Sequence, residues 1–305
     1  MGALLRAGAL PAVLALTLNA FVWGVSWWPL RQLHEAGLHP LWATALVYAA
    51  VVVVIGLRWP QAFAQMGRAP VLWVLAAAAG CTNATFNWGV SIGDVVRVVL
   101  LFYLMPLWSV LLARLLLHER LSAWAGLRIV LALAGAAIVL KPAGAGWPLP
   151  SSLPDWLGIA GGFSFALNNV MLRREAAQPS EARALAMFVG GMAVSGGLAL
   201  LLGAMGAAGV GPLPAPRVEW LGIASLLAAA MLAANLALQY GAARLRASTT
   251  AVIMLTEVVF ATASAVWWGD QRMTPQVWFG GALILAAAAL ATVEPDAAHG
   301  GPATA

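Results

Sequence analysis

The chain has 305 residues, of which 62% are hydrophobic and only 9% are charged, and its mean hydropathy is +0.88. A soluble domain carries about 25% charged residues, so these charges are too few to cover a soluble fold of this size. The composition therefore excludes a cytosolic enzyme, a disulfide-rich secreted scaffold and a disordered protein, and it indicates a membrane protein. The net charge of +5 does not suggest a nucleic-acid partner.

Ten apolar segments are candidates for membrane helices, which need about 20 mostly apolar residues each. The segments are continuous and rich in Ala and Leu, which favours helices over the alternating strands of a membrane barrel. In chain order they are Leu10–Leu30, Leu41–Leu57, Val71–Ser91, Val95–Leu116, Trp124–Leu140, Trp156–Leu172, Ala184–Leu202, Trp220–Tyr240, Thr249–Trp268 and Val277–Val293. The sequence thus predicts an all-α membrane protein with ten transmembrane helices.

Basic residues divide unequally between the two sides of these ten spans. Eleven of the 16 Lys and Arg residues fall on the side of the amino terminus. The other five are Arg31, Arg97, Lys141, Arg217 and Arg272. Because cytoplasmic loops are enriched in Lys and Arg, we expect a multi-pass protein of the cell (inner) membrane with both termini in the cytoplasm.

The chain also contains a weak internal repeat. Asn83 and Asn87 have counterparts in Asn235 and Gln239 about 150 residues later, and Leu104 has a counterpart in Leu255 at nearly the same offset. Each half has five spans, and an odd number requires the second half to be inverted. We expect a first repeat in residues 1–146, a second, inverted repeat in 147–293 and a disordered cytoplasmic tail in 294–305. Inverted repeats are typical of secondary transporters that work by alternating access.

Four amide side chains within the spans are candidate substrate ligands. Asn83 and Asn87 share one helix face, as do Asn235 and Gln239, because residues four apart are neighbours on a helix. Amides both donate and accept hydrogen bonds, so a cavity lined by four of them would suit zwitterionic or polar neutral solutes. The alternative is that they form hydrogen bonds between helices.

Glu257 is the only acidic residue in the interior of a span, and such residues are costly to bury and often functional. It could bind a substrate ammonium group or take up a proton; alternatively, a protonated Glu257 caps a carbonyl beside a helix break. Tyr103 is a further site candidate because a buried hydroxyl needs a partner. Pro106 is expected to bend the fourth span and to act as a hinge.

Aromatic residues suggest a wall for a planar substrate. Trp23 and Trp27 lie four residues apart in the first span, Phe165 is the repeat counterpart of Trp23, and Asn168 offers a nearby polar contact. Ordinary helix packing is the alternative reading. For Arg97 we expect either an interfacial position or an ion pair with Asp94, and a third reading is that it closes the cavity from the outer side.

The two five-span repeats, with Pro106 and Glu257 in the fourth and ninth spans, resemble the drug/metabolite transporter superfamily. The segments His118–Ser122 and Gly269–Met273 after those spans are similar to its signatures, and the chain looks most like the amino-acid exporter branch of the EamA type, which includes exporters of aromatic amino acids. The resemblance implies helices around a central cavity and export of small amphiphilic metabolites. Arg97 departs from the pattern, because small or hydroxyl residues are more usual there.

The sequence thus predicts a secondary transporter that exports amino acids or similar metabolites and is not an enzyme. Another cargo on the same scaffold is the alternative; phosphorylated cargo is disfavoured because no Lys or Arg falls mid-span. An intramembrane enzyme is a remote third, since it would need a convergent nucleophile and base. The partners expected are a small-molecule substrate and the lipid bilayer, with no cofactor and no metal. Proton antiport through Glu257 and facilitated diffusion are equally compatible, and so are a monomer and a dimer.

Overall fold

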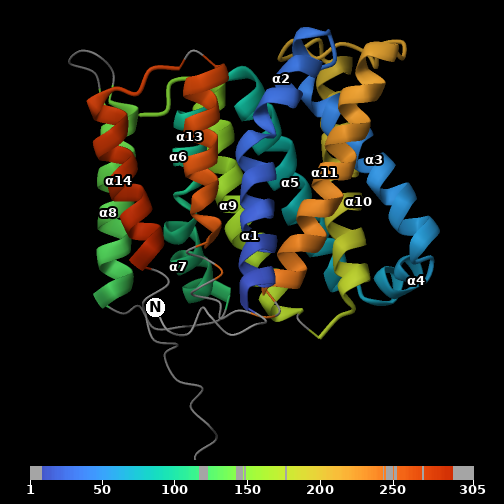
Figure 1. Cartoon of the computed structure of the whole chain (residues 1–305), viewed down its shortest axis with the longest axis horizontal. Coiled ribbons are helices and arrows are strands. Elements are labelled where there is room, and N and C mark those ends of the chain that lie inside the picture. Colours follow the sequence, from blue (N-terminus) through green and yellow to red (C-terminus); the bar gives the residue numbers. More distant parts are fainter. Residues whose placement is uncertain are drawn as a thin grey trace, which may run out of the picture.

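The computed structural model describes residues 9–116, 123–141, 147, 149–175, 177–242, 244, 250, 253–269 and 271–290. Within these residues the chain is helical and forms no strand (Figure 1). The predicted tail 294–305 and the segment His118–Ser122 lie outside the described residues. The helices are α1 (Ala9–Val25), α2 (Trp27–Glu35), α3 (Pro40–Arg58), α4 (Gln61–Arg68), α5 (Val71–Ile92), α6 (Val95–Phe102), α7 (Met105–Leu116), α8 (Ala123–Leu140), α9 (Leu153–Arg174), α10 (Ser180–Ala204), α11 (Val218–Ala242), α13 (Thr256–Trp268) and α14 (Pro275–Leu290).

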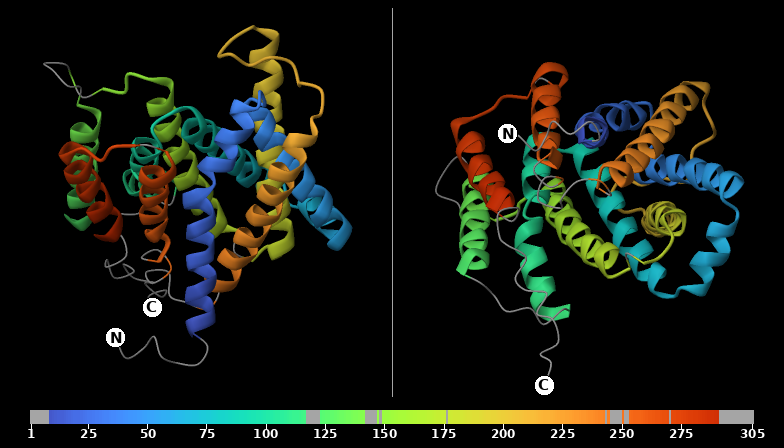
Figure 2. Two further views of the ribbon diagram at one scale, coloured as in Figure 1. Left: turned by 45° about the horizontal axis from the view of Figure 1, so that its top comes forward. Right: turned by 60° about the horizontal axis from the view of Figure 1, so that its bottom comes forward.

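The helices form one bundle in which helices far apart in sequence lie side by side. Helix α5 packs against α9 and α10, and α1 packs against α11 and α13 (Figures 1 and 2). Helices α8 and α14 form a pair at one edge, and α3 and α4 lie at the opposite edge. The chain enters α1 and leaves α14 at the same end of the bundle, as the predicted orientation requires.

Each predicted span overlaps at least one helix of the described residues; the first overlaps α1 and the start of α2, and the fourth covers α6 and α7. In the part of the chain that the structure describes, four helical segments are long and apolar enough to cross a membrane: Leu10–Glu35 (α1 and α2 together), Pro40–Arg58, Ser180–Ala204 and Val218–Gly241. A fifth crossing results if α4 and α5, which are bent by 106°, count as one. The fourth predicted span consists of two short helices, α6 and α7, because the helix is interrupted at Tyr103 and Leu104. A multi-pass arrangement therefore fits the structure, and the total of ten spans stays a prediction.

Helix α3 begins next to a buried histidine. The Nδ1 atom of His39 accepts a hydrogen bond from the Leu41 amide at 3.2 Å, which caps the helix. Burial, with a contribution from His34, lowers the pKa of His39 to about 4. The imidazole is therefore neutral near pH 7, and its Nδ1 lone pair is free for this bond.

Glycines allow the closest helix contact, between α5 and α10. A Cβ atom on Gly190 would lie within van der Waals overlap of the Ala76 carbonyl, and one on Gly80 would meet the Gly190 carbonyl. Small residues of this kind let helix backbones approach closely in a membrane, where packing drives helix association. The contact between α5 and α10 therefore depends on the absence of side chains at these two positions.

We expect Gly190→Ala to lower the free energy of unfolding by about 1–3 kcal/mol, because the added methyl group forces α5 and α10 apart. Gly197→Ala on the same helix is the matched control, since nothing lies within 4 Å of a Cβ atom there. Better helix propensity should make the control neutral or stabilising by up to about 1 kcal/mol. Unfolding in mixed detergent micelles measures both, and equal stabilities of the two variants would contradict this account of the contact.

Candidate functional site

Two interrupted helices meet at the centre of the bundle. Helix α6 ends at Phe102 and α7 begins at Met105, with a turn between them; α13 begins at Thr256 after a turn at Leu255. Leu104 and Leu255 are counterparts in the predicted repeat, and the two interruptions fall at these positions. Broken helices at mid-membrane depth are a recurrent feature of transporter binding sites, because they free backbone groups for a solute or an ion.

Tyr103 and Glu257 connect these two breaks. The Tyr103 hydroxyl lies 3.3 Å from the Met254 carbonyl oxygen and 3.3 Å from Oε2 of Glu257. Both residues are buried, Glu257 being 8% exposed. Glu257 lies in the first turn of α13, where the helix dipole favours a negative charge. The structure thus brings together two predicted site residues that are far apart in sequence.

Pro106 is the second residue of α7, directly after the first break. In the first turn of a helix the missing amide hydrogen of proline costs nothing, because that amide has no partner within the helix. The residue therefore allows a new helix to start here rather than bending a continuous one. Its role as a hinge stays a prediction.

An aromatic cluster lies beside this contact. Its members are Trp23 of α1, Phe86 of α5, Phe102 of α6 and Phe165 of α9, which we call the central aromatic cluster. The ring centroids are 6.2 Å apart for Trp23 and Phe86, 4.8 Å for Phe86 and Phe102, and 5.2 Å for Phe102 and Phe165. The sequence analysis named Trp23 and Phe165 but missed Phe86 and Phe102, which apolar helix sequences do not distinguish from lipid-facing or packed phenylalanines.

Trp27 lies elsewhere. Its Nε1 atom donates a hydrogen bond to the Ser264 hydroxyl at 2.9 Å, and the Arg31 guanidinium lies 4.9 Å from the centre of its ring. Trp27 therefore connects α2 to α13 rather than extending the ring contacts of the central aromatic cluster.

Asn168 is buried in α9, one turn after Phe165, and is 1% exposed. Its Oδ1 atom has no hydrogen-bond partner among the described residues. A buried acceptor without a partner is uncommon in folded proteins and calls for a donor from water or a solute. The Oδ1 atoms of Asn19 and Asn87 share this property.

The two amide pairs differ in their surroundings. Oδ1 of Asn83 accepts a hydrogen bond from the Tyr48 hydroxyl at 2.7 Å, and Nδ2 of Asn87 donates one to Thr44 Oγ1 at 3.2 Å. Both bonds connect α5 to α3 in the buried interior. In this conformation Asn83 and Asn87 therefore hold two helices together.

Asn235 and Gln239 instead line a cleft between α3, α10 and α11, together with Trp59 and Glu181. Nε2 of Gln239 donates a hydrogen bond to Oδ1 of Asn235 at 2.8 Å. The residues lining this cleft do not include Asn83 or Asn87. The two pairs thus have different surroundings in this conformation, and a cavity shared by all four amides stays a prediction.

No group of three or more His, Cys, Asp or Glu side chains within the described ranges could hold a metal ion. The central contact offers one carboxylate, one hydroxyl and an aromatic surface. This arrangement can bind a solute with a positive or hydrogen-bonding group and an apolar face.

Two segments match the model of the EamA-like transporter family, residues 10–141 and residues 152–293. The chain belongs to this family. It is therefore a multi-pass membrane transporter of the drug/metabolite transporter superfamily, as the resemblance implied.

This EamA-like transporter is also similar to a curated protein, "Protein RarD" from Streptomyces exfoliatus. The two are 26% identical over 286 residues, which cover 89% of this chain and 84% of that protein. A solved crystal structure of a protein superimposes with a TM-score of 0.59 at 21% identity, covering 92% of this chain and 96% of the other. At that identity the match supports the fold alone.

We expect Tyr48→Phe to destabilise this EamA-like transporter by about 1 kcal/mol, because Asn83 Oδ1 loses its donor inside the bundle. Unfolding in mixed micelles measures the change. Tyr240→Phe is the control, since that ring is 41% exposed on α11. A Tyr48→Phe variant as stable as the control would contradict the proposed contribution of this hydrogen bond.

Proposed function

We propose that this protein exports amino acids or similar small amphiphilic metabolites across the cytoplasmic (inner) membrane as a secondary transporter, by alternating access. The observation that carries the proposal is the meeting of two interrupted helices at the buried contact between Tyr103 and Glu257. Transporters place their substrate sites at such breaks near the membrane midplane, between two repeats.

The helix contacts support two inverted repeats, residues 1–146 and 147–293, because they come in equivalent pairs. If the first five spans are exchanged with the second five, the contact of α5 with α9 becomes that of α11 with α1. The contact of α5 with α10 becomes that of α11 with α3, and that of α1 with α13 becomes that of α9 with α6 and α7. The family matches to residues 10–141 and 152–293 agree with the same division.

The residues at the centre favour amphiphilic solutes. Glu257 offers a negative charge for an ammonium group, and Asn168 offers an unpaired acceptor. The central aromatic cluster provides an apolar surface beside them, which suits an aromatic or aliphatic side chain. Tyr103, Asn83, Asn87, Asn235 and Gln239 complete the set of residues that we propose to contact solute during the transport cycle.

Another metabolite or drug class on the same scaffold is the second candidate, and the single charge of Glu257 at the centre favours a cationic cargo in that case. Enzymatic activity is not part of the proposal. Both termini are proposed to lie in the cytoplasm, and Glu257 is the residue through which a proton gradient would be coupled if export is an antiport.

The proposal is tested with purified protein in proteoliposomes, by measuring uptake of each of the twenty amino acids with and without a pH gradient. We expect uptake of at least one amino acid. Glu257→Gln should lower this uptake by about tenfold or more, because a charge contact worth at least about 1.4 kcal/mol is lost.

Glu219→Gln is the matched control, since Glu219 lies exposed in the first turn of α11, away from the central contact. Its uptake should equal that of the parent protein. Absence of amino-acid uptake by the parent protein would refute the assigned substrate class. Unchanged uptake in Glu257→Gln would refute the assigned site.

A further inference from the structure

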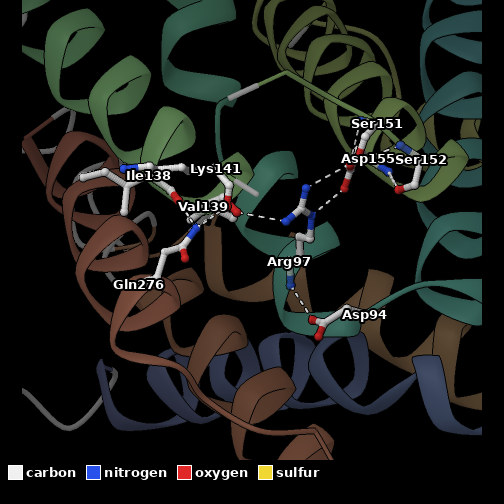
Figure 3. Close-up of polar contacts among 9 residues, drawn as sticks. All are labelled: Asp94, Arg97, Ile138, Val139, Lys141, Ser151, Ser152, Asp155 and Gln276. Atoms are coloured by element: carbon white, nitrogen blue, oxygen red, sulfur yellow. Dashed lines mark hydrogen bonds and ion pairs between the residues drawn. The ribbon is translucent and has the colours of Figure 1, made fainter. Parts of the chain in front are cut away.

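A charged cluster ties three helix ends together where α6 and α9 begin and α8 ends (Figure 3). Nε of Arg97 donates to Oδ1 of Asp155 at 2.6 Å, and Nη2 donates to Oδ2 at 3.0 Å. Nη1 of Arg97 donates to the Val139 carbonyl at 2.9 Å. One guanidinium group thus connects α6 and α8 of the first half to α9 of the second half. We call this cluster the Arg97–Asp155 contact.

Asp94, the partner expected for Arg97, has another function. Its Oδ1 atom accepts the backbone amide of Arg97 at 2.8 Å and caps the start of α6. Its carboxylate is therefore used by the helix terminus, and the Arg97 side chain extends to Asp155 instead. The expected ion pair between Arg97 and Asp94 was wrong.

Asp155 is held in place independently of Arg97. It is 1% exposed, and its Oδ2 atom accepts the backbone amides of Ser151 at 3.1 Å and Ser152 at 3.3 Å. The Ser152 hydroxyl lies 3.4 Å from the Asp155 amide in return, which is the reciprocal arrangement of a capping box. The backbone at the start of α9 therefore holds the carboxylate, and the fork-shaped guanidinium of Arg97 binds it at two points.

Other bonds join the two halves at the same end. The Gln276 side chain of α14 donates to the carbonyls of Ile138 and Lys141 at the end of α8, each at 2.6 Å. The Trp220 indole of α11 donates to the Ala36 carbonyl at 3.2 Å, and that of Trp42 donates to the Gly211 carbonyl at 3.1 Å. In the proposed orientation this end faces outwards.

The opposite end, which is cytoplasmic in the proposed orientation, has a polar contact between α4 and α10 and a close contact where Gly241 of α11 lies against Leu16 of α1. There the side chains of Gln65 and Glu181 meet at 3.4 Å, close to the limit for a hydrogen bond. Glu181 also lines the cleft between α3, α10 and α11. The inner end is thus indented beside α11, while polar contacts join the two halves at the outer end.

We infer that the Arg97–Asp155 contact closes the outer end of the transport pathway and must separate in each cycle for solute to leave. The inference rests on the proposed alternating access. It also explains the departure of Arg97 from the small or hydroxyl residues usual at its position, because only a long, charged side chain can connect α6 to both α8 and α9.

A charged contact suits a gate that opens to water. When the outer end opens, water replaces Asp155 as the partner of Arg97 and Arg97 as a partner of Asp155. The contact can therefore break without leaving buried charges unpaired. Asp155 retains its two backbone amides, and α9 retains its cap. The contact can therefore break while the helices around it stay intact.

The first test measures exposure of the helix contact directly beneath the gate. Val98 of α6 is 1% exposed and packs between α5 and α9. Its side chain lies against Gly89 of α5, and its carbonyl lies against Gly158 of α9. A Val98→Cys variant in a Cys81→Ser background is treated in sealed vesicles with a membrane-impermeant maleimide from the outer side. We expect the introduced thiol to be labelled slowly when Arg97 is retained and about tenfold faster in the Arg97→Gln variant. The Arg97→Lys variant should be labelled at an intermediate rate.

Arg97→Gln is the informative change because it removes the charge and leaves Asp155 to cap α9. Equal labelling rates for Arg97 and Arg97→Gln would overturn the inference and leave the contact a purely structural one. Labelling requires no substrate. If the labelling rates change as expected but the protein exports no amino acid, the gate is supported and the proposed substrate class is refuted.

The second test restrains the gate. Arg97→Cys and Ser151→Cys are joined across the halves with a bifunctional reagent that a reductant cleaves, again in the Cys81→Ser background. We expect export to stop and to return on reduction, which excludes misfolding as the cause. Gln32→Cys with Glu35→Cys is the matched control, because both lie on α2 and cannot restrain the two halves. Undiminished export by the fully cross-linked Arg97→Cys/Ser151→Cys protein would overturn the inference.

Discussion

The structure depends on how two interrupted helices are accommodated in an apolar interior. Backbone groups freed by a break cannot be hydrated in a membrane, so the protein must provide their partners. After the second break, the Val258 amide bonds to the Leu255 carbonyl at 3.2 Å, and the Tyr103 hydroxyl lies within reach of the Met254 carbonyl. The second interruption thus uses a side chain from the first, which places α6 beside α13 at the centre.

The surrounding helices can enclose this centre because their contacts are close. Glycines at the contact of α5 with α10 remove the space that side chains would occupy, and Gly162 of α9 brings that helix against the Phe102 carbonyl. Polar side chains are then placed where they join helices, as Tyr48 and Asn83 do, or at helix ends, as Arg97 and Asp155 do. The few polar groups of the chain therefore both join helices to one another and form the candidate site.

The all-helical, multi-pass character was predictable from hydropathy, because a span needs only length and apolarity, whereas the inverted repeat stays a prediction. Tyr103 and Glu257 stood out because polar residues are rare in such spans. Their contact with each other was not predictable, because the two residues are 154 positions apart and no local sequence pattern encodes their proximity. The pairing of Arg97 with Asp155 was missed for the same reason, and the nearby Asp94 was a plausible but incorrect partner. The signal for Asp155 was the Ser152-x-x-Asp155 capping box.

The two amide pairs have different surroundings, which bears on how the opposite conformation would be built. Under the proposed inverted repeat, one sequence pattern is present in two arrangements: α5 is closed against α10 by glycines, whereas α11 stands beside a cleft near α3. Exchanging the arrangements between the halves generates a second conformation from the same molecule. In it, under the proposed alternating access, Asn235 and Gln239 would become interhelical contacts, while Asn83 and Asn87 would line a cleft on the other side of the membrane. Each half of the molecule would then show the arrangement that the other half adopts in the opposite state.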